Sequence, residues 1–123
     1  MDGKHLPGRH PIEKFGDGGF RFGGMSHRGS LMVLPSGMSA LQASSLETLD
    51  PKSLQGLATE KDDIDFLLIG TGERMQRLPQ HLQAWLSSQN LRADIASTGA
   101  AVSTYNILLA EDRRVAAVLI AVA

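Results

Sequence analysis

The stretch that decides the fold is FLLIGTG, residues 66–72. Its first four residues are apolar without interruption, a pattern typical of a β-strand that is covered on both faces. Beyond it, an apolar stripe that includes Leu82 and Leu86 predicts a helix from about Pro79 to Ser88, and a short strand follows near residues 93–96. Strand, helix and strand in this order predict a right-handed parallel crossover.

Two further segments extend the predicted sheet towards the C-terminus. Residues 98–110 place Ala101, Tyr105 and Leu108 at helical spacing, which predicts a helix with one buried face. Residues 115–120 are the most uniformly apolar run in the chain. They therefore predict the central strand of the sheet.

The N-terminal third has short apolar stretches separated by glycine. Residues 12–15 and 20–22 flank the turn GDGG, and Asp-Gly favours the positive φ angles of a tight hairpin. A second turn at residues 27–29 leads to residues 30–34, which Pro35 stops. These segments predict three consecutive antiparallel strands, a β-meander.

The fold class predicted from these patterns is α/β: a single three-layer domain with a mixed central β-sheet, flanking helices and an N-terminal antiparallel β-meander layer. Residues 1–11 contain glycine, proline and little to bury, so they predict a flexible N-terminal arm, and residues 12–123 form the single domain. The signal is weak over residues 36–60, where Asp50 and Pro51 favour the start of a short helix.

Composition narrows the classes of function. Of the 123 residues, 42% are hydrophobic and 20% charged, and the formal net charge is −1, so no basic excess favours nucleic acid as a partner. The absence of cysteine excludes disulfides and thiol chemistry and fits a reducing compartment, so we expect a cytoplasmic protein. The longest apolar run, residues 115–123, is short of the ~20 residues that span a bilayer, and no membrane insertion is expected. The four histidines show no metal-site spacing, and we assign no metal, no cofactor and no catalytic residue.

A candidate ligand crevice lies where predicted parallel strands end. Gly70, Thr71 and Gly72 follow the buried strand, and open α/β sheets bind ligands at the carboxyl ends of their strands. Thr98 and Gly99 open the next helix, whose free amide groups can hold an anion. The alternatives are a tight turn and an ordinary helix N-cap. The remaining candidate, Asn106, lies within that helix, where asparagine either ties a loop or contacts a ligand.

Candidate partner-binding residues lie at two other places. Phe20 and Phe22 lie on the predicted hairpin, whose exposed edge can pair with a neighbouring chain and so make a homo-oligomer. Arg113 and Arg114 follow a helix end, where they either form a solvated turn or grip an acidic partner.

Several motifs also carry a family resemblance. The motifs occur along the chain in the same order as in one known family. They are FGDGGFRFGG at residues 15–24, Gly-Thr-Gly at residues 70–72, TGAA at residues 98–101, TYNIL at residues 104–108 and RRV at residues 113–115. The chain resembles the small α/β family of unknown function that includes the mitochondrial respiratory complex I assembly factor 3. The resemblance implies a three-layer fold and, for the mitochondrial member, a role in building complex I without known catalysis.

Three hypotheses about function follow. The first is a non-enzymatic assembly or interaction factor whose protein partner is a membrane or respiratory complex subunit. The second is an enzyme or a small-molecule or anion-binding protein that uses the crevice. The third is a homo-oligomeric structural protein.

Overall fold

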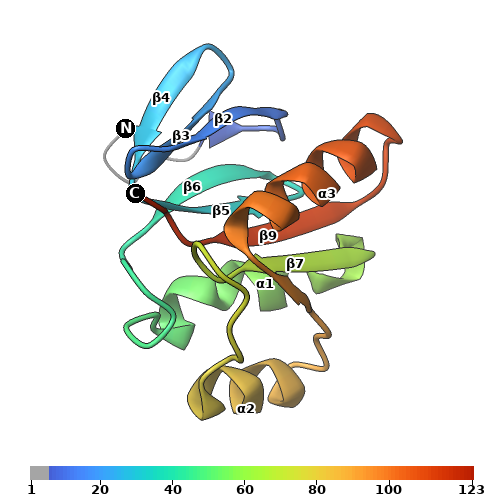
Figure 1. Cartoon of the computed structure of the whole chain (residues 1–123). Helices are drawn as coiled ribbons and strands as arrows, with labels where there is room; N and C mark the ends of the chain where they lie inside the picture. Colours follow the sequence, from blue (N-terminus) through green and yellow to red (C-terminus); the bar gives the residue numbers. More distant parts are fainter. Residues whose placement is uncertain (1–5) are drawn as a thin grey trace.

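The computed structural model describes residues 6–123. Two sheets and several helices build it (Figure 1). The six-stranded sheet has the order β1-β6-β5-β9-β7-β8 and consists of β1 (Leu6–Pro7), β5 (Ser30–Leu34), β6 (Gly37–Leu41), β7 (Phe66–Gly70), β8 (Asp94–Ala96) and β9 (Val115–Leu119). The three-stranded sheet consists of β2 (Ile12–Gly16), β3 (Gly19–Phe22) and β4 (Met25–Arg28). The α-helices are α1 (Gln55–Thr59), α2 (Gln80–Ser88) and α3 (Thr98–Ala110), and the 3₁₀ helices are η1 (Pro51–Leu54) and η2 (Lys61–Asp63).

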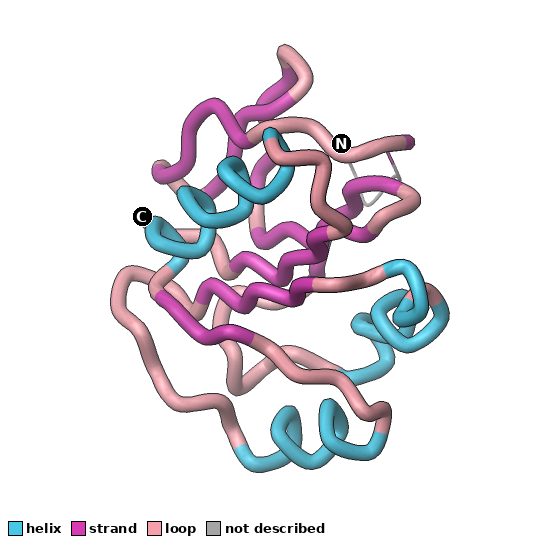
Figure 2. Tube along the Cα trace, turned by 90° about the vertical axis from the view of Figure 1, so that its right-hand side faces the viewer, coloured by secondary structure: helices cyan, strands magenta, loops and turns pink. Residues whose placement is uncertain are grey.

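The prediction of an α/β fold with a mixed central sheet is confirmed. Strand β7 pairs in parallel with β8 and with β9, whereas β5 pairs antiparallel with β9 and β6. Figure 2 shows the main sheet between α3 on one side and α1 and α2 on the other. The three-stranded sheet lies on the α3 side (Figure 1).

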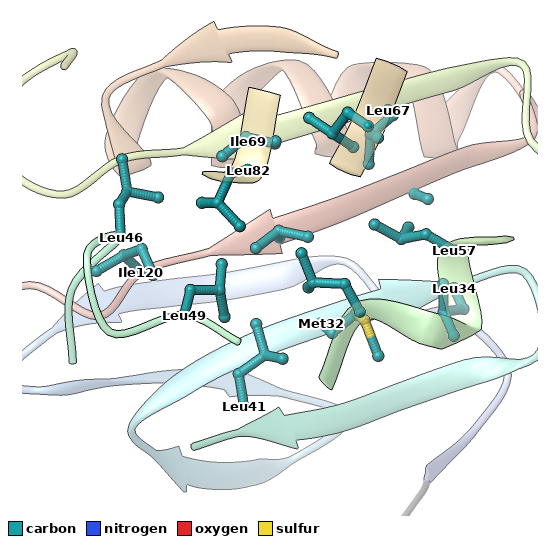
Figure 3. Close-up of a cluster of buried hydrophobic side chains, with 14 residues drawn as sticks. Met32, Leu34, Leu41, Leu46, Leu49, Leu57, Leu67, Ile69, Leu82 and Ile120 are labelled. Atoms are coloured by element: carbon teal, nitrogen blue, oxygen red, sulfur yellow. The ribbon is translucent and has the colours of Figure 1, made fainter. Parts of the chain in front are cut away.

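The continuous apolar runs are explained by a core on each face of the main sheet. In β7 the side chains of Leu67 and Ile69 point to the α2 side, where a leucine-rich cluster forms one core (Figure 3). Leu68 belongs to the opposite cluster, which includes Phe22 and Tyr105. Because successive residues of a strand face opposite sides, a strand buried on both faces has no polar position left.

The predicted meander needs one correction. The third strand of the small sheet is β4, which includes residues where the sequence predicts a turn. Ser30–Leu34, the predicted third strand, is instead β5 of the main sheet. Gly29 redirects the chain there with a φ of 95°, a value that side chains other than glycine rarely allow. All five residues of β5 are buried, which requires cover on both faces. The short β6 was missed by the sequence analysis.

The short helices that connect β6 to β7 agree with the sequence pattern. Asp50 caps η1 by accepting a hydrogen bond from the Lys52 amide, and Leu54 and Leu57 are buried beneath η1 and α1. Within residues 6–123 no helix is both long enough and apolar enough to cross a membrane.

The predicted N-terminal arm lies partly outside the described residues, which begin at Leu6. Leu6 and Pro7 pair with β6, and the guanidinium of Arg9 donates hydrogen bonds to the carbonyls of Arg113 and Val115 at 3.0 and 3.2 Å. These contacts join residues 6–9 to β6 and to the start of β9. The division into an arm and a domain at residue 12 stays a prediction.

Candidate functional site

The carboxyl end of β7 lies directly against the start of α3. A Cβ atom added to Gly70 would lie 2.8 Å from the Cα of Thr98 and 3.1 Å from Cδ2 of Leu119. Real side chains do not approach backbone so closely, so the close packing of strand and helix requires glycine at this position. We call Gly70, Thr71, Gly72 and Thr98 the strand-end junction.

Thr98 holds the junction together with both its backbone and its side chain. Its amide donates to the carbonyl of Gly72 at 2.8 Å, and its hydroxyl accepts from the Gly72 amide at 3.0 Å. The same hydroxyl donates to the carbonyl of Ile120 at 2.7 Å, and the residue is fully buried. The hydroxyl therefore has no hydrogen left to donate to a ligand.

The neighbouring polar groups are also in use. The Thr71 hydroxyl donates to the carbonyl of Arg74 at 2.7 Å and accepts from the Gln76 amide at 3.0 Å, which folds the loop after β7. Ser97 is the N-cap of α3, since its hydroxyl accepts from the Ala100 amide at 3.2 Å. These hydroxyls satisfy backbone groups of the chain itself, as the alternative readings of the motif expect.

The six predicted crevice residues do not share one cavity. A hollow of about 510 Å³ beside β7 and β9 is lined by Thr71 and Gly72, and by neither Gly99 nor Asn106. A Cβ atom on Gly99 would lie 2.9 Å from the ring of Phe15, so this glycine admits an aromatic side chain of β2.

Asn106 ties α3 to the small sheet. Its side-chain oxygen accepts from the Ile12 amide at 2.8 Å, and its side-chain nitrogen donates to the Ile12 carbonyl at 2.9 Å. The preceding residue of α3 is Tyr105, whose hydroxyl donates to the carbonyl of His10 at 2.9 Å. Burial raises the pKa of Tyr105 above its ordinary value of 10.0. The two side chains anchor the chain segment that enters β2.

The two arginines before β9 remain about half exposed. Arg114 forms a bidentate pair with Asp65, with nitrogen–oxygen distances of 2.8 and 3.0 Å, and these hydrogen bonds lower the pKa of Asp65. The guanidinium of Arg113 lies 4.9 Å from the ring centroid of Phe66 and 3.9 Å from a carboxylate oxygen of Glu111. Both groups stay accessible to a partner.

Phe20 and Phe22 are not accessible. Their side chains are 4% and 0% exposed and belong to the core beneath the small sheet. Strand β3, which carries them, lies between β2 and β4 and offers no free edge. The exposed aromatic of this sheet is Phe15, which is 42% exposed.

Two hollows were missed by the sequence analysis. One, of about 530 Å³, lies along the small sheet and has Lys14, Arg21 and Arg28 in its lining. The other, of about 750 Å³, is a largely apolar groove that α2, the loop before it and β8 form together. Its lining comprises Met75, Gln76, Arg77, Leu78, Gln83, Leu86, Ser87, Leu91, Ala93 and Ile95. We call it the apolar groove.

The fold and these contacts define a small three-layer α/β protein whose conspicuous glycine and hydroxyl motifs serve its own backbone. Residues 12–120 match the family described as "Protein of unknown function (DUF498/DUF598)". The chain belongs to this family.

Three relatives illustrate the range of the family. An uncharacterised protein of Rhodobacter capsulatus is 36% identical over 92% of this chain and 86% of its own length. The NADH dehydrogenase [ubiquinone] 1 alpha subcomplex assembly factor 3 of Xenopus tropicalis is 28% identical over 89% of this chain and 60% of its own length. A crystal structure described as an outer membrane protein from Bartonella henselae is 47% identical, with a TM-score of 0.88, and the match covers 97% of this chain and 100% of that one.

Proposed function

We propose that this chain is a non-enzymatic interaction factor that helps to assemble a multisubunit membrane complex, with respiratory NADH dehydrogenase as the complex. The observation that carries the proposal is the similarity to complex I assembly factors, which extends over 89% of the chain. The chain spans only 60% of the length of that assembly factor, so the task of the whole relative is part of the proposal.

The chemistry of the described residues supports the same proposal. The hydroxyls of Thr71 and Thr98 and the amide of Asn106, which were the candidates for ligand contacts, all bond to backbone groups of the chain. Because these side chains are bonded within the fold, we expect exposed side chains elsewhere on the surface to recognise the protein partner.

Arg113 is the residue we propose to contact the partner. Its side chain is 49% exposed, and its guanidinium lies over the ring of Phe66. The ring holds the positive charge in a fixed orientation while leaving it accessible to a partner. Arginine is common at interfaces because its planar group pairs with carboxylates and stacks on rings.

A complementation experiment tests the proposal. In the cells that encode this chain we expect its deletion to reduce the amount of assembled NADH dehydrogenase on native gels, and the wild-type gene to restore it. Arg113→Glu should restore less, whereas the matched charge reversal Arg92→Glu, also at an exposed arginine, should restore fully. Unchanged assembly after deletion would contradict the proposal.

The compartment belongs to the proposal as well. We propose a cytoplasmic protein, as the sequence analysis expects, and cell fractionation tests this against an outer membrane location of the kind stated for the Bartonella henselae structure. Recovery with the outer membrane would contradict it.

A second candidate function is binding of a small anion at the strand ends. The hollow of about 510 Å³ is the observation behind it: Arg74, Ser44 and Ser45 line it together with Thr71, and the carboxylates of Glu47 and Glu73 line it too, so an anion would have to bind beside the guanidinium of Arg74. A thermal-shift screen with nucleotides and inorganic anions tests it: saturable stabilisation that Arg74→Gln removes supports this candidate, and no stabilisation counts against it.

A further inference from the structure

We propose that the apolar groove binds a single-chain amphipathic carboxylate, a molecule of the fatty-acid type, through its acyl chain and one charged head. The apolar groove shares only Met75 and Gln76 with the lining of the hollow of about 510 Å³ beside β7 and β9, and the proposal does not rest on the assembly role.

The walls of the groove are an apolar surface that the fold leaves partly uncovered. Leu82 and Leu86 anchor α2 in the core and are buried. Leu78, Leu91, Ala93 and Ile95 pack against that core but stay only half-buried. Covering such a surface releases water and is favourable.

The groove has the size and composition of a small-molecule site. Its volume of about 750 Å³ is the largest of the three hollows described above. Binding sites for small molecules are typically apolar concavities with a few polar groups that orient the ligand. Met75, at 64% exposed, lies in the lining, and methionine adapts its shape to irregular apolar partners.

One charged side chain determines the kind of head group. Among the ten lining residues Arg77 alone carries a charge, and within residues 6–123 it takes part in no ion pair. The side-chain amide of Gln83 is already in use, since it donates to the carbonyl of Leu78 at 2.7 Å. A single guanidinium balances the one negative charge of a carboxylate, with which it can form a bidentate pair, whereas a doubly charged phosphate would keep one negative charge unbalanced beside the apolar walls.

The direct test is a titration with decanoate at concentrations where it is monomeric. Trp85, the single tryptophan, lies in α2 outside the lining and packs against the core cluster that contains Leu86, so its emission serves as a nearby probe of binding. We expect a saturable change with one site per chain and a parallel rise in Tm. Arg77→Gln should weaken decanoate binding at least about tenfold.

Matched controls separate charge from apolar contact. Arg92→Gln removes another exposed arginine, which lies between the lining residues Leu91 and Ala93 but is not itself in the lining, and it should leave decanoate affinity unchanged. Decanol, which lacks the charge, should bind wild type and Arg77→Gln equally and more weakly than decanoate binds wild type.

Three outcomes would overturn the proposal. The first is the absence of a saturable change in both emission and Tm. The second is decanoate binding that neither Arg77→Gln nor Arg77→Glu weakens. The third is a dimer, seen by sedimentation, that Arg77→Glu dissociates, because a second copy of the chain would then occupy the groove.

Discussion

The strand-end junction and the apolar groove lie on two sides of one loop, and Met75 and Gln76 line hollows on both sides. At the junction the sequence is rich in glycine and hydroxyl groups, and the structure joins them by internal hydrogen bonds. At the groove the sequence is plain, with leucine, alanine and glutamine, and the structure leaves an uncovered surface. A conspicuous sequence motif can thus have all its polar side chains bonded within the fold, while residues without any motif line a surface that is open to a ligand.

The largest effect is expected at the hydroxyl of Thr98. Thr98→Val removes the partner of both the Gly72 amide and the Ile120 carbonyl, so it should lower the free energy of unfolding by roughly 2–4 kcal/mol. Thr98→Ser keeps the hydroxyl and should cost clearly less. Urea denaturation measures both, and a Thr98→Val protein as stable as wild type would mean that the hydroxyl is not a structural tie.

Gly70→Ala tests the close approach of β7 and α3. The added methyl group would meet the backbone of Thr98, which cannot rotate away, so we expect a loss of about 1–3 kcal/mol. Gly56→Ala is the matched control, because its methyl group would meet side-chain atoms only, the Cδ1 of Leu34 at 2.6 Å and the Cε of Met32 at 3.7 Å, which can rotate away, and alanine favours a helix. Thermal unfolding measures both variants. Equal losses of stability at the two glycines would mean that the close approach of β7 and α3 does not specifically require Gly70.

Asn106→Leu tests whether α3 anchors β2. Since Asn106 pairs with both backbone groups of Ile12, its loss should cost about 1–2 kcal/mol and speed hydrogen exchange at the Ile12 amide. Unchanged exchange there would show that Asn106 does not hold the strand and would return it to the list of ligand-binding candidates.

Tyr105 gives the chain a dependence on alkaline pH. Its pKa is raised in the folded state by burial, so the folded chain keeps a proton that the unfolded chain loses above pH 10.0. Stability is therefore intact below that pH and falls above it, by up to about 1.4 kcal/mol per pH unit, until the folded pKa is reached. Tyr105→Phe should remove this dependence of the free energy of unfolding on pH. Denaturation curves of wild type and variant, collected on both sides of pH 10.0, measure it. The same slope in both proteins would contradict the argument that burial raises the pKa.

The smallest effect on stability is expected in the groove. Arg77 is exposed and makes no ion pair within residues 6–123, so Arg77→Gln should change the free energy of unfolding by less than about 0.5 kcal/mol. The same variant should lose decanoate affinity. A large loss of stability would mean that Arg77 supports the fold. The apolar groove would then be structural, as the strand-end junction is.

The main elements of the fold could be predicted because their patterns are local. The uninterrupted apolar runs of β7 and β9 and the helical spacing of Ala101 and Tyr105 each report burial directly. The place of Ser30–Leu34 could not be predicted, because its partner β9 lies far along the chain and the pairing of residues 31–33 with residues 117–119 is a long-range contact. Strand assignment from neighbouring turns fails when a single glycine redirects the chain.

The candidate site was harder to predict for a related reason. Sequence position correctly placed Gly70 and Thr98 beside each other, but whether their polar groups face a ligand or one another depends on distances that spacing does not contain. Phe20 and Phe22 show the same limit, since the turn residues identified the hairpin that carries them and not what covers their side chains. The apolar groove depends on how far α2 stands from β8, for which the sequence carries no signal.

The most direct test is a ¹⁵N amide chemical-shift titration of the chain with decanoate. We predict shifts at Leu78, Ser87 and Ile95 of the apolar groove and none at Gly72 and Thr98 of the strand-end junction. Shifts confined to the junction, or no shifts at all, would contradict the account.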